Sequence, residues 1–245
     1  TKAVIAVHLF GQVIDPRIVD LCQQNQLVLI EDAAQAHGSS ISDETGKETF
    51  AGAIGDIACF SFFPSKNMAV GGEGGMITTS KQHYAERLNS IVNHGRSSRI
   101  EAQQLGSNLR MSEVSAAIGS VQLSNLDNWL QRRRNIATRY LQECGENMKL
   151  IMPKVRENCQ HAWHQFCILV EDEVAFCQHM DEELIDARVH YPIPCHKQPV
   201  FSDHPQHNVN MTTTDSISNK LVAIPIFHEM RDDEVDRVIS ALNSY

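Results

Sequence analysis

Short apolar runs alternate with segments of helical periodicity in the first part of the chain, and this alternation constrains the fold more than any other feature. Asp15 and Pro16 precede residues 17–26 in a way typical of a helix start, and residues 81–94 place apolar side chains at helical spacing. Strands that alternate with helices predict a mostly parallel sheet covered on both faces. The expected strands are residues 2–9, 27–32, 57–63 and 74–80.

The later part of the chain has a different pattern and predicts a second, smaller α/β unit. A single long helix is expected from about residue 112 to 144, with Arg132, Arg133 and Arg134 on a solvated face. It would join two domains, residues 1–128 and residues 129–245.

Within the second domain, residues 161–170 are expected to form a strand and residues 172–188 a helix. A closing helix over residues 232–242 would be capped by Asp232 or Asp233.

Composition excludes several classes of protein. The chain has 245 residues and a net charge of -9, which argues against a general nucleic-acid binder because such proteins carry a basic patch. No apolar run approaches the roughly 18–20 residues that a membrane-spanning helix needs. Seven scattered cysteines without a C-x-x-C pair predict a reducing, cytoplasmic location. No histidine pair has the H-E-x-x-H form, so no metal site is expected.

The chain opens directly on an apolar run, KAVIAVHLF, that is typical of a buried strand. A domain seldom begins in the middle of its sheet, so we expect the N-terminal portion of a larger protein to be missing.

Three polar features follow expected strands, where ligands bind in open α/β sheets. Asp32 ends one run, Ser61 and Lys66 follow another, and a glycine run over residues 71–75 would let the backbone approach a ligand closely. An amine near a carboxylate suits pyridoxal phosphate, which needs an amine for its Schiff base and a carboxylate facing its pyridine nitrogen. Its phosphate needs hydroxyls and backbone N–H groups.

Other interpretations of these residues stay open on spacing alone. An acid at a strand end is often a cap, and a lysine before glycines is usually a solvated turn residue. A nucleotide-binding P-loop is disfavoured, because Lys66 precedes the glycines whereas the G-x-x-x-x-G-K-[ST] pattern places the lysine after them.

Four longer blocks of sequence resemble those of a known protein family, and the resemblance covers essentially the whole chain. In order, they are EDAAQAHGSS (31–40), GDIACFSFFPSKNMAVGGEGGMITT (55–79), GSNLRMSEVSAAIGSVQL (106–123) and VHYPIPCHKQPVF (189–201). Together they resemble the DegT/DnrJ/EryC1/StrS family of sugar aminotransferases. The resemblance implies a type I pyridoxal-phosphate-dependent transferase fold, the aspartate aminotransferase fold, with part of the large domain and a smaller C-terminal α/β domain.

The resemblance also implies roles for individual residues. Lys66 would form the Schiff base and move the proton, Asp32 would pair with the pyridine nitrogen, and Gln35 would contact the ring or its hydroxyl. Ser61 would bind the phosphate. Asn108 would reach the phosphate of the neighbouring subunit's cofactor, which places the active site at the interface of a homodimer.

The substrate side of the site is less closely defined. Tyr191, His196 and Gln198 lie in the block that approaches the nucleotide-sugar in the family. His37, in the acid block, would orient Asp32, face substrate or serve a structural role.

The resemblance implies transfer of an amino group from an amino acid, with glutamate as the expected donor, to a nucleotide-linked keto-sugar. Such reactions make amino sugars for polysaccharides or glycosylated metabolites. Family members with histidine in place of the lysine dehydrate sugars instead, so Lys66 favours transamination. A dehydratase or isomerase-type relative is one alternative. A truncated, non-catalytic remnant is another, because the expected missing portion supplies part of the cofactor site.

Overall fold

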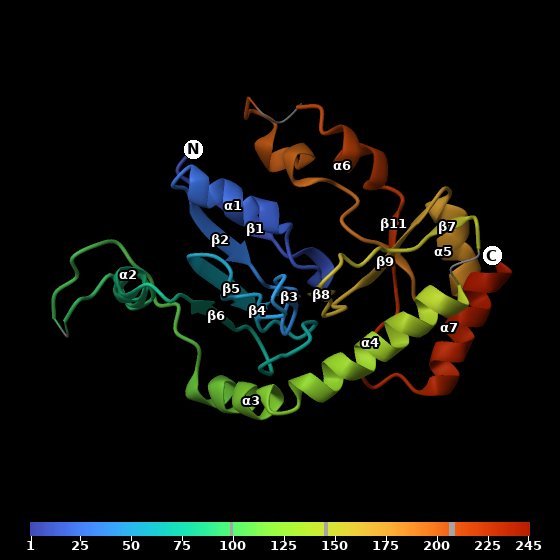
Figure 1. Ribbon diagram of the computed structural model, residues 1–245, viewed down its shortest axis with the longest axis horizontal. Helices are drawn as coiled ribbons and strands as arrows, with labels where there is room; N and C mark the ends of the chain where they lie inside the picture. The colour runs from blue at the N-terminus through green and yellow to red at the C-terminus, as the bar shows by residue number, and fades with distance from the viewer. Residues whose placement is uncertain (99, 145–146, 206–208) are drawn as a thin grey trace. The chain divides into compact units, whose positions relative to one another are not determined.

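The computed structural model describes residues 1–98, 100–144, 147–205 and 209–245, which form two compact units. Unit 1 comprises Thr1–Gln131 and Val155–His164, and unit 2 comprises Arg132–Lys154 and Gln165–Tyr245. The colour gradient in Figure 1 follows the chain through both units. The predicted domain boundary at residue 128 stays a prediction.

The central sheet of unit 1 contains all four predicted strands in the order β1-β2-β5-β6. Strands β1, β2 and β5 are parallel, and β6 is antiparallel to β5. Their bounds are Ala3–Val7, Val28–Asp32, Ile57–Ser61 and Gly75–Thr78.

The two faces of this sheet differ in how they are covered. On one face, Ala6, Glu31 and Ala58 are in register and buried. Helix α1 (Pro16–Gln24), capped by Asp15 as predicted, contributes Cys22 to the core on this side and lies alongside β1 and β2 in Figure 1. The opposite face carries Asp32. There Ile5 is 69% exposed, so the expectation of cover on both faces is wrong for β1.

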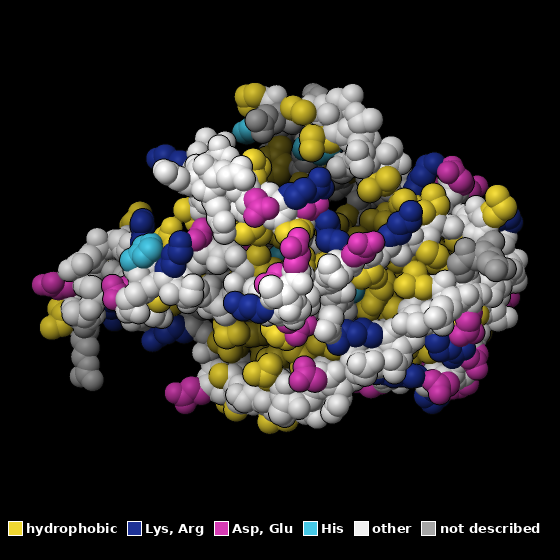
Figure 2. All heavy atoms as spheres, in the orientation of Figure 1, with side chains coloured by type: hydrophobic (Ala, Val, Ile, Leu, Met, Phe, Trp, Pro, Cys, Tyr) yellow, Lys and Arg dark blue, Asp and Glu magenta, His cyan; other side chains and the backbone are white. Residues whose placement is uncertain are grey.

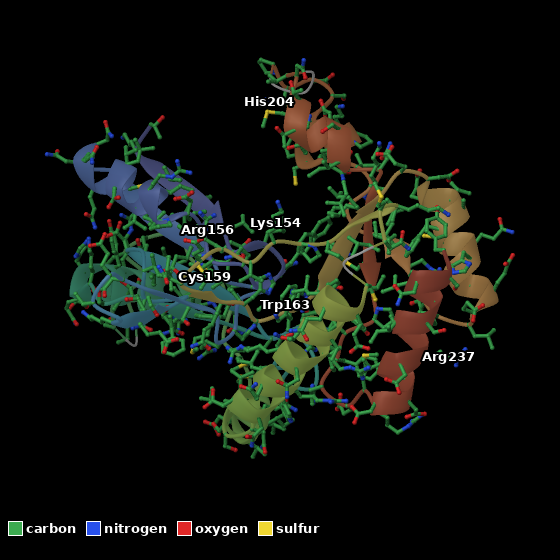
Figure 3. All side chains as sticks on the ribbon, turned by 45° about the vertical axis from the view of Figure 1, so that its right-hand side comes forward. Lys154, Arg156, Cys159, Trp163, His204 and Arg237 are labelled. Carbon is green, nitrogen blue, oxygen red and sulfur yellow. The ribbon has the colours of Figure 1, made fainter. Side chains whose placement is uncertain are left out.

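A smaller sheet brings a late segment of the chain into unit 1. Its strands, in the order β4-β3-β8, are Glu48–Phe50, Ser40–Ser42 and Cys159–Gln160. Figure 3 labels Arg156, Cys159 and Trp163 along the late segment. Arg156 Nη1 lies 2.7 Å from Asp15 Oδ2, which ties the segment to the start of α1.

The strand predicted over residues 161–170 is wrong at its beginning, because β9 covers only Phe166–Val170. Trp163 has a positive φ of 48°, a left-handed conformation that no extended strand accepts. The turn there separates β8 from β9.

Helix α2 (Gln82–Val92) forms as predicted, but the single long helix is wrong. The structure has two helices, α3 (Glu113–Leu123) and α4 (Leu126–Glu143). The Ser124 hydroxyl and the Asn125 amide both donate to the Val121 carbonyl, at 2.7 and 2.9 Å. Such local side-chain bonds compete with the helical backbone pattern and explain the break.

Unit 2 contains an antiparallel sheet in the order β10-β11-β9-β7 and the helical segment Arg132–Glu143 of α4. Phe166, Phe176 and Leu242 are fully buried in this unit. The remaining bounds are β7 Leu150–Ile151, β10 Arg188–Val189, β11 Leu221–Ile224, α5 Glu173–Glu182, α6 Thr212–Ile217 and α7 Asp232–Ser244.

Three predictions in unit 2 are wrong. The helix expected over residues 172–188 ends at Glu182, because Leu184 adopts a positive φ of 57°, and Arg188 already belongs to β10.

The other two concern the closing helix and Arg133. Neither Asp232 nor Asp233 caps the closing helix. The N-cap is Arg231, whose backbone N–H donates to the Glu234 carboxylate at 2.8 Å. Arg133 is not solvated but only 5% exposed, and it donates to the Ile226 carbonyl at 2.8 Å, because the apolar stem of an arginine can be buried when its head is bonded.

Candidate active site

Lys66 and Asp32 come together in unit 1 from two neighbouring strand ends. Asp32 is the last residue of β2 and is in register with Cys59 on β5, the strand that precedes the Lys66 loop. Burial lowers the pKa of Lys66, and the charge of Asp32 opposes this effect, so the two groups are within electrostatic reach. A lowered pKa raises the fraction of neutral amine, the form that acts as nucleophile and base.

The backbone around Lys66 is held by hydrogen bonds on both sides. The Lys66 N–H donates to the Phe63 carbonyl at 2.9 Å, and the Phe62 N–H donates to the Gly74 carbonyl at 2.8 Å. The next residue, Asn67, is buried and donates through Nδ2 to the Ala162 carbonyl at 2.9 Å. The lysine side chain therefore extends from a fixed base.

The glycine run after Lys66 packs closely against neighbouring residues. A Cβ on Gly74 would lie 2.5 Å from Val70 Cγ2 and 3.0 Å from Met111 Sδ, and one on Gly75 would lie 2.8 Å from the Phe60 carbonyl oxygen. Only Gly72 in this run has nothing within 4 Å of an added Cβ. The glycines thus let the lysine loop lie directly against its neighbours.

The turn after β2 positions Asp32 and Gln35. Asp32 Oδ1 accepts the Ala34 N–H at 3.1 Å, so this carboxylate does cap its own turn, as the simpler interpretation expected. Gln35 is buried, and its Oε1 accepts the Phe10 N–H at 2.6 Å. The cap contact is compatible with a second role, because a carboxylate has acceptor sites on both oxygens.

His37 lies in an apolar pocket of unit 1 and is only 4% exposed. Its ring centroid is 5.4 Å from that of Phe60 and 5.9 Å from that of Phe62. Burial lowers the pKa of His37 to about 4, against a raising effect of the Ser61 backbone and with a further lowering by Lys66. No hydrogen bond between His37 and Asp32 is observed among the described residues.

Ser61 and Asn108 also belong to unit 1. Ser61 ends β5, and its Oγ accepts the Phe63 N–H at 3.3 Å. Asn108 is exposed on the segment before α3, where its Oδ1 accepts from Arg110 Nε at 3.0 Å. The roles of both residues in binding phosphate stay predictions.

The predicted substrate residues belong to unit 2. Tyr191 is 53% exposed with a φ of 56°, and Gln198 Nε2 donates to the Ile193 carbonyl at 3.0 Å. His196 Nε2 lies 3.3 Å from Asp215, which also pairs with Lys197 at 2.7 Å. These three residues lie on one surface segment, and their contact with substrate stays a prediction.

A buried polar pair that was not predicted lies next to the site. His8 Nε2 lies 2.8 Å from Glu31 Oε2, and both side chains are fully buried. The available signal was the pair of acids that ends the apolar run LVLIED, since strand residues alternate between faces and one acid had to point into the core.

Among the described residues, no group of three histidine, cysteine, aspartate or glutamate side chains could hold a metal ion. None of the helices in this described part is long and apolar enough to cross a membrane.

The model of the DegT/DnrJ/EryC1/StrS aminotransferase family matches residues 1–243. The chain belongs to this family. The predicted fold class is confirmed by the crystal structure of S. venezuelae DesV in complex with a ketimine intermediate. It matches with a TM-score of 0.93 and 30% identity over 100% of this chain and 65% of that one.

Two curated relatives of this DegT/DnrJ/EryC1/StrS family member are named as sugar aminotransferases. A dTDP-3-amino-3,6-dideoxy-alpha-D-galactopyranose transaminase of Aneurinibacillus thermoaerophilus is 40% identical over 100% of this chain and 66% of its own length. A UDP-N-acetyl-3-dehydro-alpha-D-glucosamine 3-aminotransferase of Acidithiobacillus ferrooxidans is 32% identical over 99% of this chain and 64% of its own. The chain spans about two thirds of the length of these relatives.

Proposed function

We propose that this chain carries the cofactor-binding lysine of a pyridoxal-phosphate-dependent sugar aminotransferase. The observation that carries the proposal is the placement of Lys66 and Asp32, an amine with a lowered pKa within electrostatic reach of a carboxylate at the neighbouring strand end. This donor set fits the cofactor, which needs an amine and a carboxylate at opposite ends of its ring. The structure of Bacillus subtilis NtdA with bound cofactor PMP, matched at a TM-score of 0.86 and 28% identity, supports the cofactor class.

When bound, the cofactor supplies an electron sink that stabilises negative charge on the substrate carbon beside the nitrogen. The neutral Lys66 amine would hold the cofactor covalently, with loss of water, until the amine of the substrate displaces it. The freed Lys66 amine would then carry the proton between carbon atoms. Asp32 would hold the proton on the pyridine nitrogen. The Ser61 hydroxyl would donate a hydrogen bond to the phosphate. The buried ring of His37 would pack against Phe60 and Phe62 on the strand and loop that lead to Lys66.

We infer that the acceptor is a nucleotide-linked keto-sugar and that glutamate is the amino donor. The printed names of the relatives, which include dTDP- and UDP-linked sugars, support this substrate class. Lysine rather than histidine at position 66 favours transamination over dehydration. Tyr191, His196 and Gln198 would contact the nucleotide-sugar from their exposed segment.

We further infer a homodimer with a shared active site. Helix α3 exposes Val114, Val121 and Leu123, which are 73%, 67% and 60% accessible. Figure 2 shows hydrophobic side chains at the surface where Figure 1 places this helix. A second copy that covers α3 would bury this apolar surface and would bring the exposed Asn108, four residues before the α3 cap, toward its partner.

We also infer a reducing, cytoplasmic location. All seven cysteines, each within the described part of the chain, are free thiols. Unpaired cysteines in this number are typical of a reducing compartment.

A screen of nucleotide-linked keto-sugars with glutamate tests the function, with product analysis by mass spectrometry. An aminated sugar is expected from the wild-type protein and not from Lys66→Ala, whose rate should fall by about 100- to 10,000-fold. Lys81→Ala is the matched control, because Lys81 is a surface lysine paired with Asp56, and it should retain activity. A dehydrated sugar without amine would favour the dehydratase class, and failure to bind cofactor would favour the remnant.

A further inference from the structure

A buried polar pair, His8 and Glu31, joins the first two strands of unit 1. His8 follows β1, and Glu31 precedes Asp32 on β2. Both side chains are fully buried, with Nε2 of His8 2.8 Å from Oε2 of Glu31. The strand neighbours of Glu31 in register are Ala6 and Ala58, whose small side chains leave room for the carboxylate.

The hydrogen bonds define the protonation state of the pair. The backbone N–H of Ile14 donates to Nδ1 of His8 at 3.1 Å, so Nδ1 has to be an acceptor. The ring proton therefore sits on Nε2 and is donated to Glu31. A charged ring would place a second N–H against the Ile14 N–H.

Glu31 also holds a loop. Its oxygens accept the backbone N–H groups of Gly52, Ile54 and Gly55 at 2.7, 2.9 and 2.6 Å. Burial raises the pKa of Glu31, but the hydrogen bonds from His8, Gly55 and Gly52 outweigh it and leave the pKa lowered. With His8 included, four donors face one carboxylate, which requires the ionised form.

The pair connects directly to the residues expected at the cofactor. Successive strand residues point to opposite faces, so fixing Glu31 in the core directs Asp32 to the other face. The His8 backbone N–H donates to the Asp32 carbonyl at 3.0 Å. Two residues after His8, the Phe10 N–H holds Gln35 at 2.6 Å.

Stability alone does not account for such a pair. Replacing both partners of a buried hydrogen bond by apolar groups of similar shape is often nearly neutral or stabilising, whereas removing one partner leaves a buried polar group unsatisfied. Because all their hydrogen bonds are formed, His8 and Glu31 give the end of β2 a defined geometry.

We propose that His8 and Glu31 are positioning residues for the cofactor, which fix the end of β2 so that Asp32 and Gln35 face the pyridine ring. This inference rests on the proposed function, because it concerns how this chain binds pyridoxal phosphate. His8 and Glu31 would touch neither cofactor nor substrate.

Two amide substitutions of His8 separate the hydrogen bonds of the ring. The amide nitrogen of His8→Gln can replace Nε2 and keep the bond to Glu31. The shorter side chain of His8→Asn can replace Nδ1 and keep the bond to Ile14, but it leaves Glu31 without its side-chain donor. The dissociation constant for pyridoxal phosphate is measured for both in the intact protein, together with the unfolding temperature and hydrogen exchange of the Phe10 amide.

His8→Gln is expected to bind the cofactor within about threefold of wild type, and His8→Asn at least about tenfold more weakly, because a hydrogen bond to a charged group is lost. The Phe10 amide should exchange faster in His8→Asn only. A merely structural role would lower the unfolding temperature of both variants without separating their cofactor affinities. Equal affinities, or equal Phe10 exchange, would overturn the proposal.

A measurement on the wild-type protein keeps the test decisive if either variant fails to fold. Two-bond proton–nitrogen NMR of His8 should show a neutral ring with its proton on Nε2, and a charged ring or a proton on Nδ1 would overturn the pair. Wild-type protein that binds no pyridoxal phosphate would instead count against the proposed function. The ring state and the Phe10 exchange would then still decide whether the pair holds the strand end.

Discussion

Lys66 and its neighbours in unit 1 are fixed by packing and hydrogen bonds, whereas Tyr191, His196 and Gln198 in unit 2 lie on a surface segment. His37 beside Lys66 is 4% exposed, while Tyr191 is 53% exposed. Covalent chemistry needs groups held in fixed geometry, and substrate selection is commonly carried by surface loops. The difference indicates that changes in unit 1 should affect cofactor and stability, and changes in unit 2 should affect substrate affinity.

The largest effect expected is a pH dependence of stability that comes from His37. Its pKa is lowered from 6.5 to about 4 by burial, so below pH 6.5 the unfolded chain binds more protons than the folded one. Stability should therefore fall as the pH drops from 6.5 to 4, by up to about 3 kcal/mol.

His37→Leu should flatten this slope, as measured by urea unfolding at several pH values. His83→Leu, which changes an exposed histidine on α2, should leave the slope unchanged. Identical slopes for wild type and His37→Leu would contradict the description of unit 1 as the buried, rigid side of the comparison.

The next effect concerns the carboxylate at the end of β2. Asp32→Asn should weaken the binding of pyridoxal phosphate by about 10- to 100-fold, because a hydrogen bond to a charged group is worth about 1.5–3 kcal/mol. Fluorescence titration with the cofactor measures it. Asp20→Asn, on the exposed side of α1, is the matched control and should bind as wild type does.

The glycine run allows a test of packing without chemistry. Gly74→Ala should lower the free energy of unfolding by about 1–3 kcal/mol, because its Cβ would lie 2.5 Å from Val70. Gly72→Ala meets nothing within 4 Å and should be neutral or slightly stabilising. If both variants were equally stable, close packing of the lysine loop would not be what the glycines provide.

The smallest effect is expected in unit 2. His196→Ala should raise the KM for the nucleotide-sugar by about three- to tenfold, the value of one hydrogen bond, and leave kcat and cofactor absorbance unchanged. His204→Ala, an exposed histidine of the same unit labelled in Figure 3, should change none of these. A loss of cofactor in His196→Ala would contradict the assignment of cofactor binding to unit 1 and substrate affinity to unit 2.

The sequence predicted the four strands of the central sheet of unit 1 because each is a mainly apolar run. It did not predict the three short strands of the smaller sheet, β3, β4 and β8, which lack such runs. It predicted Asp32 and Lys66 together because their spacing and surrounding blocks resemble a family. It could not predict the break between α3 and α4, since Ser124 and Asn125 are compatible with an exposed helix surface until their side chains bond to Val121.

Hydrogen bonds between polar residues far apart in the sequence could not be predicted either. Arg133 looks like part of a solvated basic run, and only the fold places the Ile226 carbonyl beside it. The His8–Glu31 pair depends on strand register, which the alternation of residues alone does not define. Both of these missed contacts join residues far apart in the sequence.

The most direct test of Lys66 as the covalent anchor is to reduce the protein with borohydride in the presence of pyridoxal phosphate and to map the labelled peptide by mass spectrometry. Reduction makes the bond between lysine and cofactor permanent. One phosphopyridoxyl group on Lys66, absent when Lys66→Ala is treated in the same way, is the expected result. Labelling of other lysines alone, or no label at a saturating cofactor concentration, would contradict the assignment.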